Sequence, residues 1–154
     1  MIQSPSYSSG KIWYSFKHNG PGIRYEIALS LKHGHIVWVE GPYPCGQWPD
    51  IKIFRHCLRN FLDPSERVEA DDGYIGDQPK YCKTPGGFSS RTENIDEKRR
   101  RIRARHETVN LRLKHFCILN KTYRHNLKDH AFVFGTVAVL VQLSLENSDP
   151  LLDL

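Results

Sequence analysis

Hydrophobic and polar residues follow the period of β-strands in the first part of the chain. Three segments have strand composition, over residues 12–17, 24–31 and 36–40. The short turn His33-Gly34 joins the second and third segments, so we predict an antiparallel hairpin. A loop rich in proline and glycine follows over 41–49. Apolar residues then recur at helical spacing, which predicts an amphipathic helix over 51–62 with Asp50 as its N-cap residue.

Helical spacing returns in the second half of the chain. Short strands are predicted first, over 67–70 and over 78–84. From Glu93 to about Leu119 helix formers dominate, and apolar residues repeat at steps of four and three. A last helix is predicted over about 128–146. This order of elements predicts an α/β fold in which helices flank one mixed sheet.

The last predicted helix contains the longest apolar run of the sequence. Four polar or small residues interrupt the run, which extends from Ala131 to Leu145. A membrane span needs about 20 consecutive apolar residues. We therefore expect a buried core helix and no association with a membrane.

Composition places the chain among globular domains. It has 154 residues, of which 39% are apolar and 25% charged, and a net charge of +5. Residues 1–10 read as a frayed N-terminus, 11–147 as one domain and 148–154 as a tail. The four cysteines form no CxxC pair, which favours free thiols in a reducing compartment. The basic balance makes polyanions plausible partners.

Two acids stand where open α/β sheets carry their active groups. Asp71 follows a predicted strand, and Glu107 lies on the long predicted helix, one position from its apolar stripe. Together they would make a hard oxygen site suited to Mg²⁺. Two such ions can activate water and stabilise the leaving oxygen in phosphodiester cleavage. Taken alone this spacing is weak, because the chain has 17 acidic residues.

A run of cations immediately precedes Glu107. Residues 98–105 hold six Lys or Arg side chains in eight positions. On a helix one polar face would carry Glu107 among cations and an amide: Arg100, Arg103, Asn110 and Lys114. A carboxylate among cations suits a site whose substrate is a phosphate backbone. A solvated helix face or a nuclear-localisation-like stretch explains the run equally well.

At these residues the sequence resembles the Harbinger-type (PIF/Harbinger) transposases, which have a DDE endonuclease domain. The resemblance runs from about Trp13 to the C-terminus. Three ordered elements carry it: Ile36-Val37-Trp38 … Gly41-Pro42 … Gly46 … Asp50, then Ala70-Asp71-Asp72-Gly73-Tyr74, then Ala104-Arg105-His106-Glu107 … Leu113-Lys114-His115-Phe116-Cys117-Ile118-Leu119. The second element, which looks like the family's A-D-x-G-Y, is the most specific.

The resemblance implies an RNase H-like nuclease that cuts and joins DNA with Mg²⁺ or Mn²⁺ in the nucleus. Asp71 would be the second catalytic acid and Glu107 the third, with Asp50 as a further metal ligand or a plain helix cap. The motif aligns Asp71 as the ligand and Asp72 as a turn residue, with the reverse assignment of the pair as the alternative. Phosphate contacts would come from four basic residues: Arg100, Arg103, Arg105 and Lys114. Recognition of transposon ends would come from a separate DNA-binding protein.

Two departures from the family pattern change what is expected. The family's first aspartate lies on its first strand, and residues 1–49 contain no aspartate. We therefore expect an impaired nuclease, or a non-catalytic remnant that binds DNA or protein; a truncated gene model, a relic copy and a domesticated derivative all fit. Either 12–16 fills the place of the absent strand, or its neighbours keep unpaired backbone groups. In addition, His115 replaces an arginine, and one residue is missing between Glu107 and Phe116.

Overall fold

An antiparallel hairpin lies at the centre of the structure. The computed structural model describes residues 11–84, 93–147 and 150–151. The hairpin strands are β3 (Ile23–Leu29) and β4 (Ile36–Pro44), with Ile27 opposite Val39 and Ala28 opposite Trp38. The predicted hairpin is therefore confirmed, but β4 continues four residues beyond the predicted end at Glu40. Pairing of Ile23 with Pro44 and of Arg24 with Tyr43 extends it into the predicted loop.

The remaining strands are only two residues long. β1 (Tyr14–Ser15) pairs with β2 (Gly20–Pro21), and β5 (Val68–Glu69) pairs in parallel with β6 (Cys82–Lys83). Within the described residues the strands thus form three separate pairs. The chain is mixed α/β with small sheets, and the expectation of one mixed sheet is wrong for this part of the chain.

The described residues form four α-helices, which cover the three predicted helices in the expected order but with different ends. They are α1 (Asp50–His56), α2 (Glu93–His115), α3 (Cys117–Asn120) and α4 (His130–Asn147). The predicted helix over 51–62 stops at Cys57, where the backbone leaves the helical region, and continues as the 3₁₀ turn η2 (Leu58–Phe61). Phe116 adopts an extended conformation and separates α2 from α3, which shortens the helix predicted to reach Leu119.

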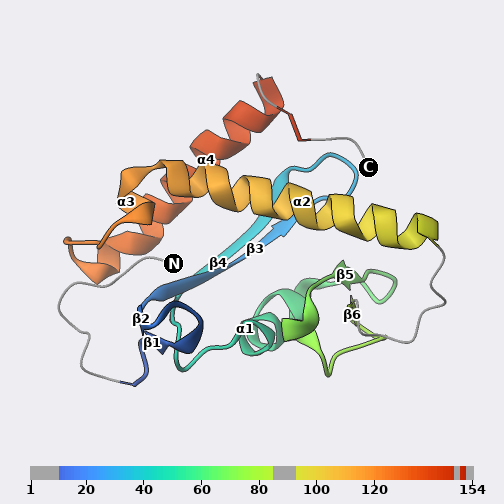
Figure 1. Cartoon of the computed structure of the whole chain (residues 1–154), viewed down its shortest axis with the longest axis horizontal. Coiled ribbons are helices and arrows are strands. Elements are labelled where there is room, and N and C mark those ends of the chain that lie inside the picture. The colour runs from blue at the N-terminus through green and yellow to red at the C-terminus, as the bar shows by residue number, and fades with distance from the viewer. Residues whose placement is uncertain (1–10, 85–92, 148–149, 152–154) are drawn as a thin grey trace.

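The helices cover the hairpin from two sides (Figure 1). α2 and α4 contact each other and α4 packs on β4, whereas α1 contacts β3 and the 3₁₀ turn η3 (Asp72–Tyr74). The main core lies between the hairpin, α2 and α4, and includes these buried residues: Ile23, Val109, Leu113, Phe134, Val137 and Val141. The four cysteines are unpaired, as expected. Of the predicted termini, 1–10 lie outside the described residues.

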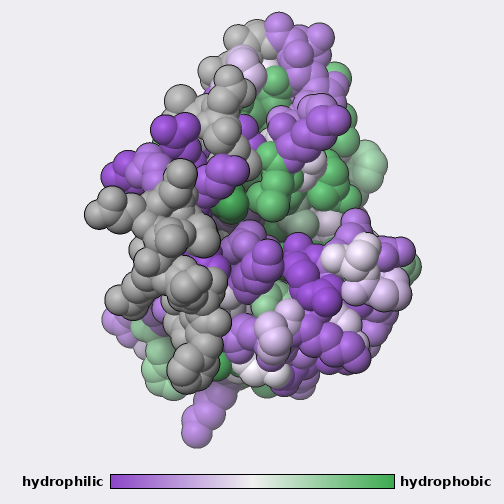
Figure 2. Space-filling model, turned by 90° about the vertical axis from the view of Figure 1, so that its right-hand side faces the viewer, coloured by the Kyte–Doolittle hydropathy of each residue, from purple (hydrophilic) through white to green (hydrophobic). Residues whose placement is uncertain are grey.

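Helix α4 has one buried face and one exposed face, so the expectation of a wholly buried helix is wrong. Phe134 and Val141 are in the core, but Phe132 and Val139 are 80% and 59% exposed. By length and composition the segment Leu127–Asn147 could cross a membrane, which is weak evidence because a soluble core helix passes the same test. Figure 2 shows a patch of hydrophobic surface in the upper half of the molecule, the half that contains α4 in Figure 1.

Candidate functional site

A large groove lies between the hairpin, α1 and α2. Its volume is about 1040 Å³, and residues of β3, of the segment 66–71 and of α2 form its walls. The three acids predicted as metal ligands, Asp50, Asp71 and Glu107, all line it. Thirty-five residues separate Asp71 from Glu107 in the sequence. The fold therefore brings two distant carboxylates to the same groove.

Asp71 begins the turn that follows β5. Its Oδ1 accepts a hydrogen bond from the backbone N–H of Gly73 at 2.9 Å, which caps the 3₁₀ turn η3. A methyl group added to Gly73 would lie 2.9 Å from that oxygen and 3.8 Å from Oδ2 of Asp50. The carboxylates of Asp71 and Asp50 thus approach the same point. Asp72, the alternative ligand, is exposed and is not among the residues that line the groove.

Asp50 does not act as the predicted helix cap. It is the first residue of α1, Pro49 occupies the N-cap position, and no side chain caps the helix. Pro49 has no N–H group and fits this helix start well. The Asp50 carboxylate instead forms an ion pair with Arg24, with 3.3 Å between Oδ1 and Nε. Arg24 also donates to the Trp48 carbonyl at 2.8 Å, so strand β3 holds the residue that neutralises Asp50.

The predicted phosphate-binding residues of α2 have different surroundings. Arg103 is exposed and lines the groove with Glu107, which is also exposed. Arg100 is exposed but forms an ion pair with Glu97 at 2.6 Å. Lys114 is exposed and lines a neighbouring cavity of about 200 Å³. Of Arg100, Arg103 and Lys114, only Arg103 lies on the same groove as the acids.

Arg105, also predicted as a phosphate contact, lines the groove but is largely buried. It is 6% exposed and donates to the carbonyl of Leu31 at 2.8 Å. At the next residue of the same helix, His106 Nε2 lies 3.0 Å from the carbonyl of Ile27. In the described residues β3 pairs only with β4, and 12–16 does not extend that sheet. Side chains of α2, and not another strand, thus bind these two carbonyls.

One acid on the groove wall was not predicted from the sequence. Glu26, in the middle of β3, is 6% exposed and lines the groove. Burial raises the pKa of its carboxyl to about 7, and the charges of Asp50 and Glu40 add to the effect against an opposing hydrogen bond from Trp38. Trp38 Nε1 donates to Oε2 at 3.2 Å, while Oε1 is buried without a hydrogen-bond partner. An acid inside an apolar strand was the available signal.

Tyr74 is within electrostatic reach of three carboxylates. Burial raises the pKa of its hydroxyl well above the usual range, and the charges of Glu26, Asp50 and Asp71 raise it further. Arg24 opposes them. The ring of Tyr74 packs edge-on against Phe54 of α1, with centroids 5.5 Å apart. This side of the groove is therefore acidic, with Arg24 as the cation that opposes its charge.

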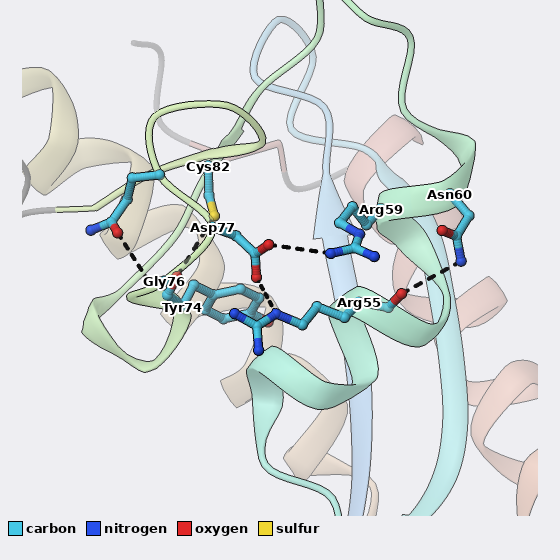
Figure 3. A network of polar contacts seen from close by, with 8 residues as sticks. Arg55, Arg59, Asn60, Tyr74, Gly76, Asp77 and Cys82 are labelled. Carbon is cyan, nitrogen blue, oxygen red and sulfur yellow. Dashed lines mark hydrogen bonds and ion pairs between the residues drawn. The ribbon is translucent and has the colours of Figure 1, made fainter.

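An ion-pair network connects the loop that follows Asp71 to α1 (Figure 3). Asp77 is buried, and its carboxylate accepts hydrogen bonds from Arg55 and from Arg59, the latter at 3.3 Å. Both arginines belong to the α1–η2 segment, whereas Asp77 follows the turn that carries Tyr74. The network therefore fixes the loop after Asp71 relative to the helix that begins at Asp50.

The groove does not contain a preformed metal centre within the described residues. In that part of the chain no three His, Cys, Asp or Glu side chains are close enough together to hold an ion. The buried Oε1 of Glu26, which lacks a partner, is nevertheless an oxygen donor of the kind that Mg²⁺ and Mn²⁺ prefer. As placed in the described residues, these side chains do not form a site that would hold such a cation.

No family model, curated protein or solved structure matches this chain. The class that the fold defines is therefore mixed α/β with small sheets.

Proposed function

We propose that this chain is a DNA-processing nuclease domain of Harbinger-type transposase descent, with an RNase H-like architecture and Mg²⁺ or Mn²⁺ as cofactor. One observation supports it most: Asp71 and Glu107 line one groove although they belong to different elements. A hairpin, a helix, a strand that ends before Asp71 and a helix that carries Glu107 also follow in the order that the resemblance implies.

The chemistry follows from the residues of the groove. Divalent cations bound there would activate water and stabilise the leaving oxygen of a phosphodiester. Asp71, Glu107 and Asp50 would hold them, and Arg103 would position the phosphate backbone beside Glu107. Because the family's first aspartate has no counterpart in residues 1–49, we expect slow cleavage. A separate protein would recognise transposon ends, and the reaction would take place in the nucleus.

The charge of the groove predicts that DNA binding depends on metal. Its lining includes six carboxylates and five Lys or Arg side chains. Three of these cations already have partners: Arg99 lies 3.6 Å from Glu69, and Arg67 and Arg105 donate to backbone carbonyls. Such a surface attracts phosphate poorly until cations neutralise its acids. Mg²⁺ is therefore expected to strengthen DNA binding.

Cleavage of supercoiled plasmid tests the proposal. With Mn²⁺ or Mg²⁺ we expect weak nicking by the wild-type chain that chelation abolishes, and its loss in Asp71→Asn and Glu107→Gln. Asp72→Asn is the matched control, because Asp72 adjoins Asp71 but does not line the groove. No nicking by pure wild-type protein, or equal nicking by all variants, would contradict a nuclease.

A non-catalytic remnant that binds DNA or protein is the second candidate. The absence of a preformed metal centre in the described residues and the pairing of Asp50 with Arg24 favour it. DNA binding in gel shifts separates the two functions. A remnant would bind equally with EDTA and with Mg²⁺, and Asp71→Asn would leave its affinity unchanged.

A further inference from the structure

One face of α4 is exposed, apolar and regularly spaced. Phe132, Val139 and Leu143 are 80%, 59% and 50% exposed. With Thr136 they follow one another at steps of four, three and four residues, the spacing at which two helices pack along a continuous seam. Residues 130–145 contain no Asp, Glu, Lys or Arg. These four side chains, called the α4 seam below, therefore form an uncharged surface that another molecule can cover.

Two details of the α4 seam suit close packing against another helix. Thr136 is polar, but its hydroxyl already donates to the carbonyl of Phe132 at 2.9 Å, so its burial would leave no donor unsatisfied. Gly135 adjoins it, and a methyl group added there would meet no described atom within 4 Å. Glycine inside a helix is destabilising relative to alanine, and packing within the described chain does not require it here. The glycine leaves room for a second helix to approach closely.

The two ends of α4 carry opposite charge. Three exposed cations, Lys121, Arg124 and Lys128, precede the helix, and Asp129 is the only acid beside them. Glu146 is exposed in the last turn. The helix dipole adds positive charge at the N-terminus and negative charge at the C-terminus. An antiparallel copy of α4 would bring each end against the opposite end, whereas a parallel copy would place like charges together.

We propose that the α4 seam binds a second copy of this chain, with the two α4 helices antiparallel about a twofold axis between Thr136 and Val139. Phe132 then faces Leu143 of the second copy at both ends of the seam. A twofold interface must be complementary to itself, and an uncharged seam between ends of opposite charge meets that condition. A membrane surface fits less well, because helices that lie on membranes carry Lys and Arg on their other face, whereas the other face of α4 is buried in the core.

The pairing is weak and depends on concentration. α4 has 18 residues, so the seam is at most about 27 Å long. One helix face of that length buries less than the roughly 800 Å² per partner of a stable interface. The main core lies within each chain, so the chains fold first and pair afterwards. In dilute solution α4 therefore keeps this face exposed.

Sedimentation velocity of the whole chain tests the pairing. We expect the wild type to move from monomer towards dimer between about 5 µM and about 500 µM, the range of weak protein pairs. Leu143→Glu places one carboxylate from each chain in the apolar seam, and should weaken pairing at least about tenfold. Thermal melts check that the variant folds.

Leu111→Glu is the matched control. Leu111 is also a leucine on a helix, and it is 58% exposed against 50% for Leu143, but it belongs to α2. The change introduces the same charge at a similarly exposed position away from the α4 seam. Leu111→Glu should therefore pair as the wild type does.

Exchange of the end charges tests the antiparallel arrangement. Lys128→Glu and Glu146→Lys each place like charges together at the ends of an antiparallel pair, and each should weaken pairing about threefold at low salt. The double variant restores opposite charges and should pair like the wild type. A double variant that pairs no better than either single variant would contradict the antiparallel arrangement.

Other results would overturn the pairing itself. These are a single chain at every concentration, unchanged pairing in Leu143→Glu, or an equal loss in Leu111→Glu. Cosedimentation with phosphatidylcholine vesicles that Leu143→Glu abolishes, without any dimer, would assign the seam to a lipid surface instead. α4 contributes none of the described residues that line the groove, so the plasmid test of the nuclease and this test of pairing can fail independently.

Discussion

His130 shows at the scale of one residue how burial determines the protonation state of a side chain. It is 0% exposed, its Nδ1 lies 2.7 Å from the Tyr25 hydroxyl, and the ring of Tyr123 packs edge-on at 4.5 Å. Nε2 has no hydrogen-bond partner. Burial lowers the pKa of His130 to about 4. The side chain is therefore neutral in the folded protein over the physiological range of pH.

This shift predicts how stability depends on pH. In the unfolded chain His130 binds a proton below a pH of about 6.5. In the folded chain it binds that proton only below a pH of about 4. The contribution to stability is present above pH 6.5 and is lost as the pH falls towards 4, by about 3 kcal/mol in total. Urea unfolding at pH 4.5 and 7.5 measures it.

The comparison between variants isolates His130 from other titrating groups. His130→Gln should lose less stability than the wild type between pH 7.5 and pH 4.5. His125→Gln, a change at an exposed neighbour, should keep the wild-type dependence. The same dependence in His130→Gln and in the wild type would show that His130 is not held neutral by the fold.

Single residues also show what sequence could and could not predict. Asp71 and Glu107 could be chosen because a strand end and a helix beside a basic run are visible in the sequence. Glu26 was missed because its burial depends on how α1 and the segment after β5 pack on β3, and its only local signal was an acid inside an apolar strand. The bond between Arg105 and the carbonyl of Leu31 could not be predicted either, because the basic run does not show which of its cations is buried.

At the scale of elements, both faces of α4 carry apolar residues, but one face is buried in the core and the other is exposed to solvent. Val141 is 3% exposed and belongs to the core, whereas Val139, two residues earlier, is 59% exposed. Both are valines in the middle of one helix, so their intrinsic helix propensities are equal. Any difference between their replacements must come from packing.

Val141→Ala should destabilise the chain by about 2 kcal/mol, because it leaves a cavity in the core. Val139→Ala should change stability by less than about 0.5 kcal/mol, since alanine is the better helix former and no packing is lost. Urea unfolding of the two variants checks both values. Equal destabilisation would mean that the exposed face of α4 is covered in solution.

Element boundaries were predicted less well than element order. The helix over 51–62 was expected to be continuous, but the Asn60 side chain donates to the carbonyl of His56 at 2.9 Å, where α1 ends. That hydrogen bond between a side chain and the backbone competes with the helix. The spacing of apolar residues in the sequence does not reveal it. The hairpin was predicted because alternation and a short turn are local signals.

At the scale of the whole molecule, the groove is produced by the meeting of segments distant in sequence. The hairpin supplies Glu26, α1 supplies Asp50, the segment after β5 supplies Asp71, and α2 supplies Glu107. The order of these elements was predicted, but the single sheet expected to carry them was not found in the described residues. Pairing between distant strands leaves little trace in local periodicity, so three small sheets could not be foreseen.

The location of a bound ion tests the central claim most directly. Crystals of the chain grown with Mn²⁺ would give anomalous difference maps in which the ion identifies its own position. We predict a peak in the groove, coordinated by the Asp71 carboxylate, with Glu107 facing it from α2. Well-resolved maps with peaks only outside the groove, or with Asp71 and Glu107 on separate surfaces, would contradict the account.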